Sequence, residues 1–365
     1  MSNASSVQSG QDPRVWVLTG HKAGDNSQVM ALAEALGWPY EAKRFYYKPW
    51  ELITNRLLGA TLAGIDRGAS SPLCAPWPEL VITAGRRNEP VARWIQRQSP
   101  STRLVHIGRP WSPLSVFDLI VTTPQYFLPD QPNILHNHLP LHGMNSRQLE
   151  EAASFWRGRF SKLQRPWIAV LIGGDSGPFV FTEYKGRRLG QLVNELAERA
   201  NGALLVSNSA RTPKSVYDAF LDEIKVPAHV HNWQPGQSEN PYLAYMQLAD
   251  ELVVTGESMS MLTEASYTGK PLHIFDPGDE GAWWRHLHNY RFKPLSHHFA
   301  MHVAPERMHR DVGKIQRQLL LDGRAVWLGD RFHEAGGVKL PDDVQRAADR
   351  VRALFAPPGE RLANI

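Results

Sequence analysis

The chain has 365 residues, of which 42% are hydrophobic and 21% are charged. This composition is typical of a folded globular protein, and the length favours two domains that each bury a core. The formal net charge of +4, from 40 basic and 36 acidic residues, does not indicate a nucleic-acid-binding protein. The single cysteine, Cys74, excludes an intrachain disulfide and fits a reducing cytosol. No run reaches the roughly 18 apolar residues that a transmembrane span needs.

The first half of the chain alternates short apolar runs with helical patterns, after a polar tail over residues 1–13 that is predicted to be disordered. Such alternation predicts an α/β domain with a mainly parallel sheet, here over residues 14–163. The predicted strands are Val15–Leu18, Leu80–Thr83, Leu104–Ile107 and Leu119–Thr122, and the predicted helices are Gln28–Leu36, Pro90–Gln98 and Ser146–Leu163.

The same alternation begins again after Arg165-Pro166 and predicts a second α/β domain over residues 164–335. A final amphipathic helix is predicted at Pro341–Phe355, within a C-terminal segment of residues 336–365. The predicted strands of the second domain are Trp167–Ile172, Ala203–Ser207, Val230–Trp233, Leu252–Val254 and Leu272–Phe275, and its predicted helices include Arg187–Ala200 and Lys214–Leu221.

The segment after the strand Leu252–Val254 has the pattern of a phosphate-binding turn, because small residues open a helix directly after a strand. The first amides of a helix lack intrahelical partners and lie at the positive end of its dipole, so they bind anions. Glu264, on the helix face of Ser260, could accept a hydrogen bond from a sugar hydroxyl. An ordinary strand–helix unit with a serine N-cap is the alternative. The candidate residues are Thr255, Gly256, Glu257, Ser258, Met259, Ser260 and Glu264.

Three other predicted strands of the second domain also end in small or hydrogen-bonding residues. Because ligands of open α/β sheets bind at the carboxyl ends of the strands, these residues are predicted to share one site. Arg211 could pair with a diphosphate, whereas Trp233 could line a base pocket or be a core aromatic. The candidates are Gly173, Gly174, Ser207, Asn208, Ser209, Arg211, Asn232 and Trp233.

Two strand ends of the first domain carry further candidates. After the first strand, Asp25 stands at a helix start as either an N-cap or a catalytic carboxylate, and His21 is a less favoured base. Lys22 is expected to position or neutralise a donor phosphate. The strand Leu80–Thr83 is followed by Gly85, Arg86 and Arg87. These residues could contact an anionic acceptor or a phosphate.

The segment Phe45–Asp66 combines aromatic and basic residues. It indicates a membrane interface or a lipid-like acceptor, or else a helix packed on the sheet. The chain has no Asp-x-Asp and no Walker-type phosphate loop, and its histidine pairs have no acidic or cysteine partner at metal-ligand spacing. We therefore expect no metal ion and no cofactor.

Several of these motifs together resemble the family named for the plant "elongated mitochondria" fission factor, which also occurs in bacteria. More distantly, the layout is similar to the glycosyltransferases with two Rossmann-like domains, the GT-B class. The motifs are residues 20–28, 83–87, 171–174, 207–212 and 255–260, with Glu264 and 269–271.

The GT-B resemblance implies two Rossmann-like domains facing across a cleft, with the C-terminal helix returning to the first domain. It implies a nucleotide sugar as substrate in the second domain, with the diphosphate on the amides of Ser258, Met259 and Ser260 and the ribose on Glu264. It also makes Asp25 the candidate base.

The sequence therefore predicts a metal-independent glycosyltransferase that acts on a saccharide or a lipid-linked acceptor. We expect it in the cytoplasm or peripherally on the inner face of the membrane. Two alternatives stay open: a non-catalytic adaptor that recruits a partner to a membrane, and a nucleotide-sugar epimerase of the same architecture.

Overall fold

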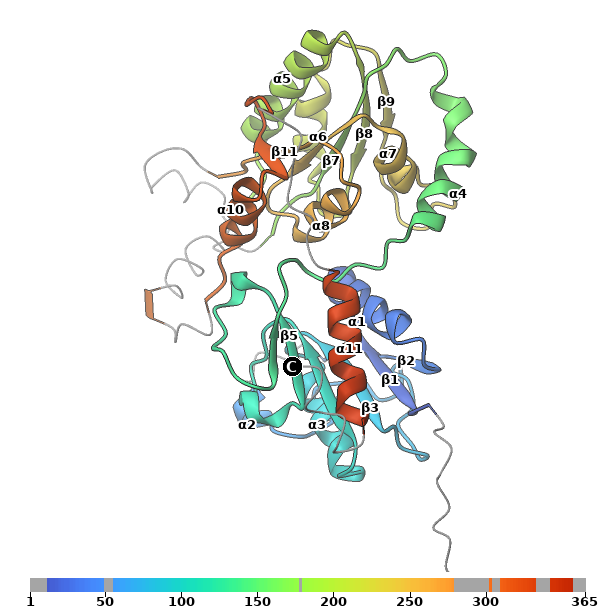
Figure 1. The fold of residues 1–365 in the computed structure, drawn as a ribbon, viewed down its shortest axis with the longest axis vertical. Coiled ribbons are helices and arrows are strands. Elements are labelled where there is room, and N and C mark those ends of the chain that lie inside the picture. Colours follow the sequence, from blue (N-terminus) through green and yellow to red (C-terminus); the bar gives the residue numbers. More distant parts are fainter. Residues whose placement is uncertain are drawn as a thin grey trace, which may run out of the picture. The chain divides into compact units, whose positions relative to one another are not determined.

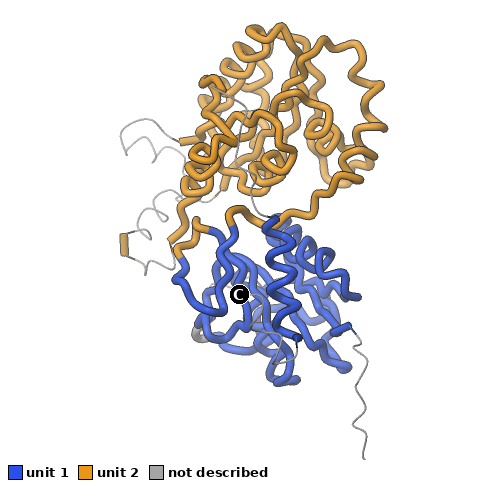
Figure 2. Tube along the Cα trace, viewed as in Figure 1, with its two compact units in different colours: residues 1–123, 128–137, 341–365 blue, residues 124–127, 138–340 orange. Residues whose placement is uncertain are grey.

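The computed structural model describes residues 12–48, 55–176, 179–278, 302–303, 309–332 and 342–356. The chain forms two compact units, one of residues 1–123, 128–137 and 341–365 and the other of residues 124–127 and 138–340 (Figure 2). Each unit holds a six-stranded sheet in which every described pairing is parallel (Figure 1). The predicted α/β class with two Rossmann-like domains is confirmed. Residues 1–11 of the predicted tail lie outside the described residues.

Unit 1 has the strand order β2-β1-β3-β4-β5-β6, so the direction in which strands are added reverses between β1 and β3. Loops that follow these two strands therefore lie at a topological switch point, where open α/β sheets bind ligands. The elements are β1 Val15–Thr19, α1 Ala23–Leu36, β2 Tyr40–Arg44, α2 Asn55–Leu58, β3 Leu80–Ala84, α3 Glu89–Gln98, β4 Arg103–Ile107, β5 Leu119–Thr122, β6 Ile134–His136 and α11 Asp343–Phe355.

The C-terminal helix α11 belongs to unit 1, as predicted, and packs on α1 (Figure 1). It buries Ala347, Ala348 and Val351. Its Arg352 guanidinium donates to the carbonyl oxygens of Ala35 and Leu36 at 2.7 and 3.2 Å, where the last carbonyls of α1 lack intrahelical partners. Helices α1 and α11, which are far apart in the sequence, are thus joined by apolar packing and by the contact of Arg352 with the end of α1.

The segment Phe45–Asp66 does not form the single packed helix that was considered for it. Its described ends pair with each other, because the Lys48 amide donates to the Gly64 carbonyl at 3.0 Å and the Asp66 amide to the Tyr46 carbonyl at 2.8 Å. The short helix α2 lies between these ends, and residues 49–54 lie outside the described residues.

Unit 2 has the strand order β12-β11-β10-β7-β8-β9. Numbered from β7, this is the 3-2-1-4-5-6 order of the Rossmann fold, with its switch point between β7 and β10. The elements are α4 Ser146–Trp156, β7 Trp167–Ile172, α5 Glu183–Ala200, β8 Ala203–Asn208, α6 Lys214–Leu221, β9 Ala228–His231, α7 Tyr242–Leu248, β10 Glu251–Thr255, α8 Met259–Tyr267, β11 Leu272–Phe275, α10 Gly313–Leu321 and β12 Ala325–Trp327.

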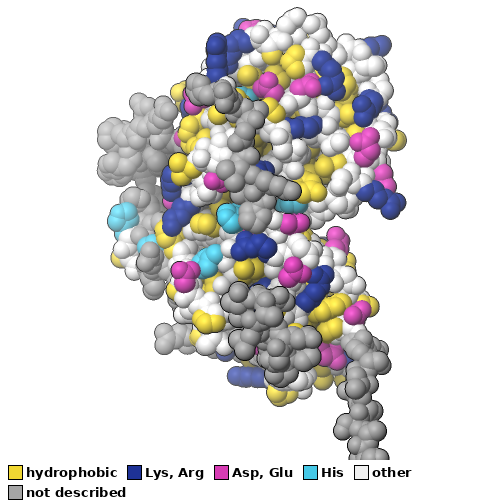
Figure 3. Space-filling view, viewed as in Figure 1, with side chains coloured by type: hydrophobic (Ala, Val, Ile, Leu, Met, Phe, Trp, Pro, Cys, Tyr) yellow, Lys and Arg dark blue, Asp and Glu magenta, His cyan; other side chains and the backbone are white. Residues whose placement is uncertain are grey.

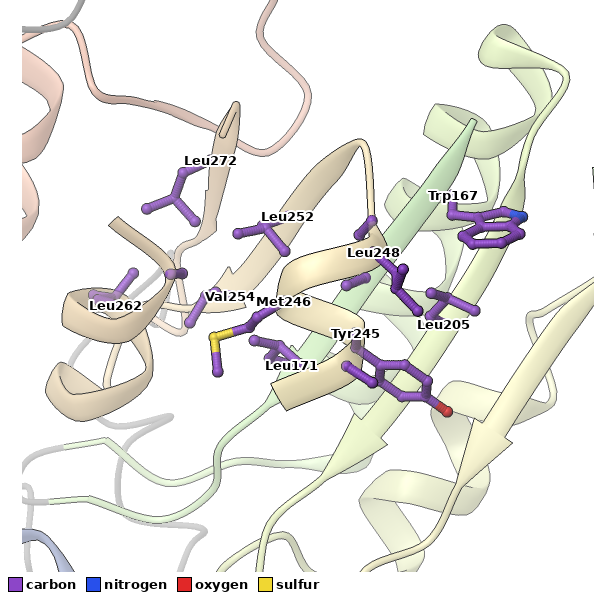
Figure 4. Packing of buried hydrophobic residues seen from close by; sticks show 14 of the residues in the cluster. Trp167, Leu171, Leu205, Tyr245, Met246, Leu248, Leu252, Val254, Leu262 and Leu272 are labelled. Atoms are coloured by element: carbon purple, nitrogen blue, oxygen red, sulfur yellow. The ribbon is translucent and has the colours of Figure 1, made fainter. Parts of the chain in front are cut away.

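The sheet of unit 2 is buried on both faces. Alternate side chains of β7 point to opposite faces, so Leu171 packs with α7 and α8 (Figure 4), whereas Val170 packs with α5 and α6. Helices α5 and α6 cover one face of the sheet, and α4, α7, α8 and α10 cover the other. The direction in which strands are added reverses at β7. This reversal opens the switch point between the loops that follow β7 and β10.

Three boundaries differ from the predictions. Unit 2 includes residues from 138 onward, not only from 164, because α4 packs on α7 and places Trp156 in the core of unit 2. Strand β9 ends at His231, since Asn232 turns its side chain toward Asn208 instead of continuing the ladder. Helix α1 begins at Ala23 rather than Gln28, so Asp25 lies inside its first turn.

Candidate functional site

The turn after β7 comes very close to the loop after β8. A Cβ on Gly174 would lie 2.1 Å from the backbone oxygen of Arg211, and a Cβ on Gly173 would lie 1.9 Å from a carboxylate oxygen of Glu257. Both glycines are therefore needed for close approach. Their amides are already occupied, because Gly173 donates to the Thr255 hydroxyl at 2.8 Å and Gly174 to Glu257 Oε1 at 2.7 Å. They line the site but have no amide hydrogen left for a ligand.

Helix α8 begins at Met259, and its start is not capped by a side chain. The N-cap hydroxyl of Ser258 does not accept from a helix amide; the Arg211 guanidinium lies 3.3 Å from it. Among the described residues, the amides of Met259, Ser260 and Met261 have no hydrogen-bond acceptor. Ser258 and Met259 are buried, whereas Ser260 is partly exposed. These amides and Arg211 make an electropositive group at the switch point.

Glu257 fills the space between the turns that follow β7 and β10, and only 1% of it is exposed. Its Oε1 accepts from the Gly174 amide and, at 3.1 Å, from the Thr255 hydroxyl. Its Oε2 has no hydrogen-bond partner among the described residues. Burial raises the pKa of Glu257, although these hydrogen bonds and the nearby Arg211 charge oppose the shift. Glu257 thus contacts the neighbouring turn and does not face solvent.

Glu264 lies in the middle of α8 and is held by a residue from α7. The Tyr242 hydroxyl donates to Glu264 Oε2 at 2.6 Å. Burial raises the pKa of Glu264, and this hydrogen bond offsets part of the rise. The sequence analysis missed Tyr242, which lies in a helix that it did not predict. The carboxylate is oriented by Tyr242, and none of the described residues donates to its Oε1.

The end of β8 is joined to the end of β9 by side-chain amides. Asn208 donates to Asn232 Oδ1 at 2.8 Å and accepts from the Trp233 amide at 2.6 Å. Trp233 is half-buried and is not in the described cores, so it is not the core aromatic that was the alternative. The Ser209 hydroxyl bonds to the Gly173 carbonyl at 3.0 Å, and Ser207 is buried beneath the loop. Polar side chains thus join the loops that follow β7, β8 and β9.

At the switch point of unit 1, two asparagines fix the loops. Asn26 closes the loop after β1, since its side chain accepts from the Gly20 amide and donates to the Gly20 carbonyl, both at 2.8 Å. The buried Asn88 donates to the carbonyls of Leu18 and Ala84, at the ends of β1 and β3. Its Oδ1 accepts from the Tyr47 hydroxyl at 2.5 Å. The sequence analysis assigned no role to Asn26 or Asn88.

Asp25 lies in the first turn of α1 and faces the end of β3. A Cβ on Gly85 would lie 2.5 Å from Asp25 Oδ2, and the φ of Gly85 is +73°. Glycine is therefore required there for both the conformation and the space. Asp25 is not the N-cap of α1, since that position belongs to Lys22. Its carboxylate is partly exposed and so can reach a ligand.

His21 packs beside Asp25's loop and interacts with Arg87. The Arg87 guanidinium can only donate, so His21 Nδ1 accepts from it at 3.2 Å. Burial lowers the pKa of His21, as do the charges of Arg87 and Lys22. A neutral His21 with Nδ1 accepting carries its proton on Nε2. Its exposed nitrogen is therefore a donor, which favours Asp25 over His21 as a base.

Arg86 and Arg87, which follow β3, both lie over aromatic rings. The Arg86 guanidinium is 4.9 Å from the centre of the Trp111 ring, and that of Arg87 is 5.3 Å from the centre of the Tyr47 ring. Trp111 is held in place by the buried Glu89, which accepts from its amide at 2.8 Å. The two rings thus hold both guanidiniums, and that of Arg87 lies beside the loop that carries His21.

The predicted residues thus form two groups, one at the carboxyl ends of the strands of each sheet. On the face drawn in Figure 3, basic and acidic side chains are interspersed over each unit, in keeping with the nearly balanced charge.

In the part of the chain that the structure describes, no helix has the length and apolar character needed to cross a bilayer.

Comparison with known proteins gives the family. Residues 23–292 match the model of the mitochondrial fission ELM1 family. The mitochondrial fission protein ELM1 of Arabidopsis thaliana is 28% identical over 242 residues, which cover 60% of this chain and 56% of that protein. An uncharacterized protein of Rickettsia prowazekii is 26% identical over 295 residues, which cover 72% of this chain and 83% of that protein. The match therefore spans little more than half the length of the plant relative.

Among solved structures, a UDP-GlcNAc 2-epimerase from Methanocaldococcus jannaschii aligns with a TM-score of 0.49 at 10% identity, covering 94% of this chain and 99% of that one. A glycosyltransferase from Rickettsia africae aligns with a TM-score of 0.44 at 11% identity, covering 98% and 100%. The family model spans more than half of the chain. The predicted family is thereby confirmed, and the protein belongs to the mitochondrial fission ELM1 family.

Proposed function

We propose that unit 2 binds a nucleotide sugar and that the protein transfers the sugar to a saccharide or lipid-linked acceptor. The observation that carries the proposal is the uncapped start of α8, with Arg211 beside it, at the switch point of a sheet with Rossmann strand order. Fixed amide dipoles and a guanidinium stabilise the charge that develops on a departing diphosphate. Because these groups supply the positive charge, the proposed transfer needs no divalent metal ion.

The proposal divides the roles between the two units. Glu264, held by Tyr242, accepts from the ribose hydroxyls, and Asn232 and Trp233 line the base. In unit 1, Asp25 takes the proton of the acceptor hydroxyl while Arg86 and Arg87 contact an anionic acceptor. A lipid-linked acceptor would bring the protein to a membrane surface without a span.

Binding is tested with purified full-length protein and a panel of nucleoside diphosphates and nucleotide sugars, by thermal shift followed by calorimetry. A ligand that binds only the folded state raises the melting temperature. We expect at least one nucleotide sugar to do so and to be consumed when acceptor is added. Isomerisation of the nucleotide sugar without acceptor would instead identify an epimerase. The absence of any shift across the panel would contradict the proposal.

Glu264→Ala is expected to weaken nucleotide-sugar binding about tenfold or more, because hydrogen bonds to a charged group contribute about 1.5–3 kcal/mol. Calorimetry measures the affinity. The control is Glu183→Ala, which removes a half-exposed carboxylate of α5 in the same unit and should leave the affinity unchanged. Wild-type affinity in Glu264→Ala would refute the ribose role.

A non-catalytic adaptor is the second candidate, and the similarity to a plant mitochondrial fission protein favours it. An adaptor would keep partner binding when Arg211, Glu264 and Asp25 are all replaced. If the wild type transfers no sugar and the triple variant still binds its partner, these results would select the adaptor function.

A further inference from the structure

Glu257 is a buried acid that the proposed transfer does not use. It lies between the loops after β7 and β10, where a Rossmann sheet normally receives a phosphate. The Gly174 amide donates to its Oε1 at 2.7 Å, and the Thr255 hydroxyl, which accepts from the Gly173 amide, donates to the same oxygen at 3.1 Å. The carboxyl group therefore occupies the acceptor position that a phosphate oxygen would take on this turn.

The Glu257 carboxyl group fills the space beside the Gly173-Gly174 turn. A Cβ on Gly173 would come within 1.9 Å of Glu257 Oε1 and 2.9 Å of the Thr255 hydroxyl oxygen. The turn is also held from the other side, since Thr212 and Ser209 both bond to the Gly173 carbonyl. A phosphate cannot share this space with the carboxyl group, so a bound diphosphate must lie elsewhere.

Glu257 directly precedes the N-cap of α8. By joining the turn after β7 to the start of α8, it fixes the direction in which the free amides of Met259, Ser260 and Met261 point. The remaining oxygen, Oε2, has no partner among the described residues.

We propose that Glu257 is a positioning residue: its carboxyl group replaces a phosphate at the Gly173-Gly174 turn and directs the diphosphate of the nucleotide sugar to the start of α8 and Arg211. This inference rests on the proposed function. In this proposal, Glu257 determines whether the anion is held by the amides of the Gly173-Gly174 turn or by the amides at the start of α8.

The burial of Glu257 has a consequence for the pH dependence of binding and stability. Burial raises the pKa of Glu257 above that of an ordinary glutamate. Arg211 is the charged side chain that interacts with it, and its other contacts, with Gly174, Thr255 and its own amide, are neutral. As the pH rises through the raised pKa, the carboxyl group ionises, and a negative charge beside the anion site weakens binding. Since the folded state holds this proton more tightly than the unfolded state, the same ionisation lowers stability.

The test compares wild type, Glu257→Gln and Glu257→Ala from mildly acidic to mildly alkaline pH. The ligand is the nucleotide sugar found in the panel, whose diphosphate diester stays fully ionised throughout and so does not titrate itself. Melting temperature without ligand and affinity by calorimetry are both measured. The matched control is Glu251→Gln, at the opposite end of β10, whose carboxylate pairs with His273 at 3.0 Å.

Glutamine has the shape of a neutral glutamic acid. We therefore expect Glu257→Gln to match the wild type at low pH and to exceed it in affinity and melting temperature at high pH. Glu257→Ala should lose about tenfold or more in affinity at low pH, through loss of the contacts that orient α8. Glu251→Gln should keep the wild-type pH dependence of affinity.

Equal pH profiles of affinity and melting temperature in wild type and Glu257→Gln would overturn the proposal, as would wild-type affinity in Glu257→Ala. These results differ from failure of the proposed function, in which the wild type binds no nucleotide sugar at any pH. The ligand-free melting temperatures still test the ionisation of Glu257 in that case.

Discussion

Gly174→Ala is expected to destabilise unit 2 by about 3 kcal/mol or more, at or above the upper end for overpacking, because the new methyl group meets backbone atoms. It would lie 2.1 Å from the Arg211 carbonyl oxygen, 2.3 Å from the carbonyl carbon and 2.7 Å from the Thr212 nitrogen. Backbone cannot rotate away as a side chain can. A fall of roughly 10 °C in melting temperature would follow for a unit of this size.

The control for this change is Gly158→Ala in the same unit, where a Cβ would meet nothing within 4 Å. That variant should melt within about 1–2 °C of the wild type, as surface substitutions usually do. Gly173→Ala should cost less than Gly174→Ala, because its new methyl group meets side-chain atoms of Glu257 and Thr255. Equal melting temperatures for Gly174→Ala and Gly158→Ala would contradict the close approach of the two loops.

Asp25→Asn should reduce transfer by about 10²- to 10⁴-fold, the usual contribution of a general base. The amide keeps the shape of the carboxylate beside Gly85 but cannot take the acceptor proton. Nucleotide-sugar affinity should stay unchanged, since the donor is assigned to unit 2. Initial rates with a fixed donor and varied acceptor measure the loss in kcat.

Glu34→Gln is the matched control for Asp25→Asn, because Glu34 is an exposed acid on the same helix. It should transfer at the wild-type rate. Transfer at the wild-type rate by Asp25→Asn as well would remove Asp25 from the reaction, and His21→Ala would then be the next variant to measure.

The buried strands could be predicted from the sequence because both faces of each sheet are covered. Runs such as Trp167–Ile172 are apolar at every position, and their lengths separate them from helices. The edge strand β2 has no such run, since four of its five residues are exposed. Helix α7 is only seven residues long and was missed, and Tyr242 was missed with it.

The loops of the candidate site could be located from the sequence, but the contacts within them could not. Glycine and serine after a strand indicate an anion site in general. They do not show that Glu257 occupies the Gly174 amide, or that Arg211 approaches Ser258. These contacts join segments far apart in the chain, and only the folded backbone brings them together. The roles of Asn26 and Asn88 depend in the same way on the positions of β1 and β3.

The central claim is that the amides at the start of α8 hold the diphosphate of a nucleotide sugar. Hydrogen exchange of the peptide containing Met259, Ser260 and Met261, with and without saturating nucleotide sugar, tests it most directly, because these amides have no described acceptor in the free protein. We predict that exchange slows at these three amides on binding and that Arg211→Ala abolishes the effect. Binding of the nucleotide sugar with unchanged exchange at all three would contradict the claim.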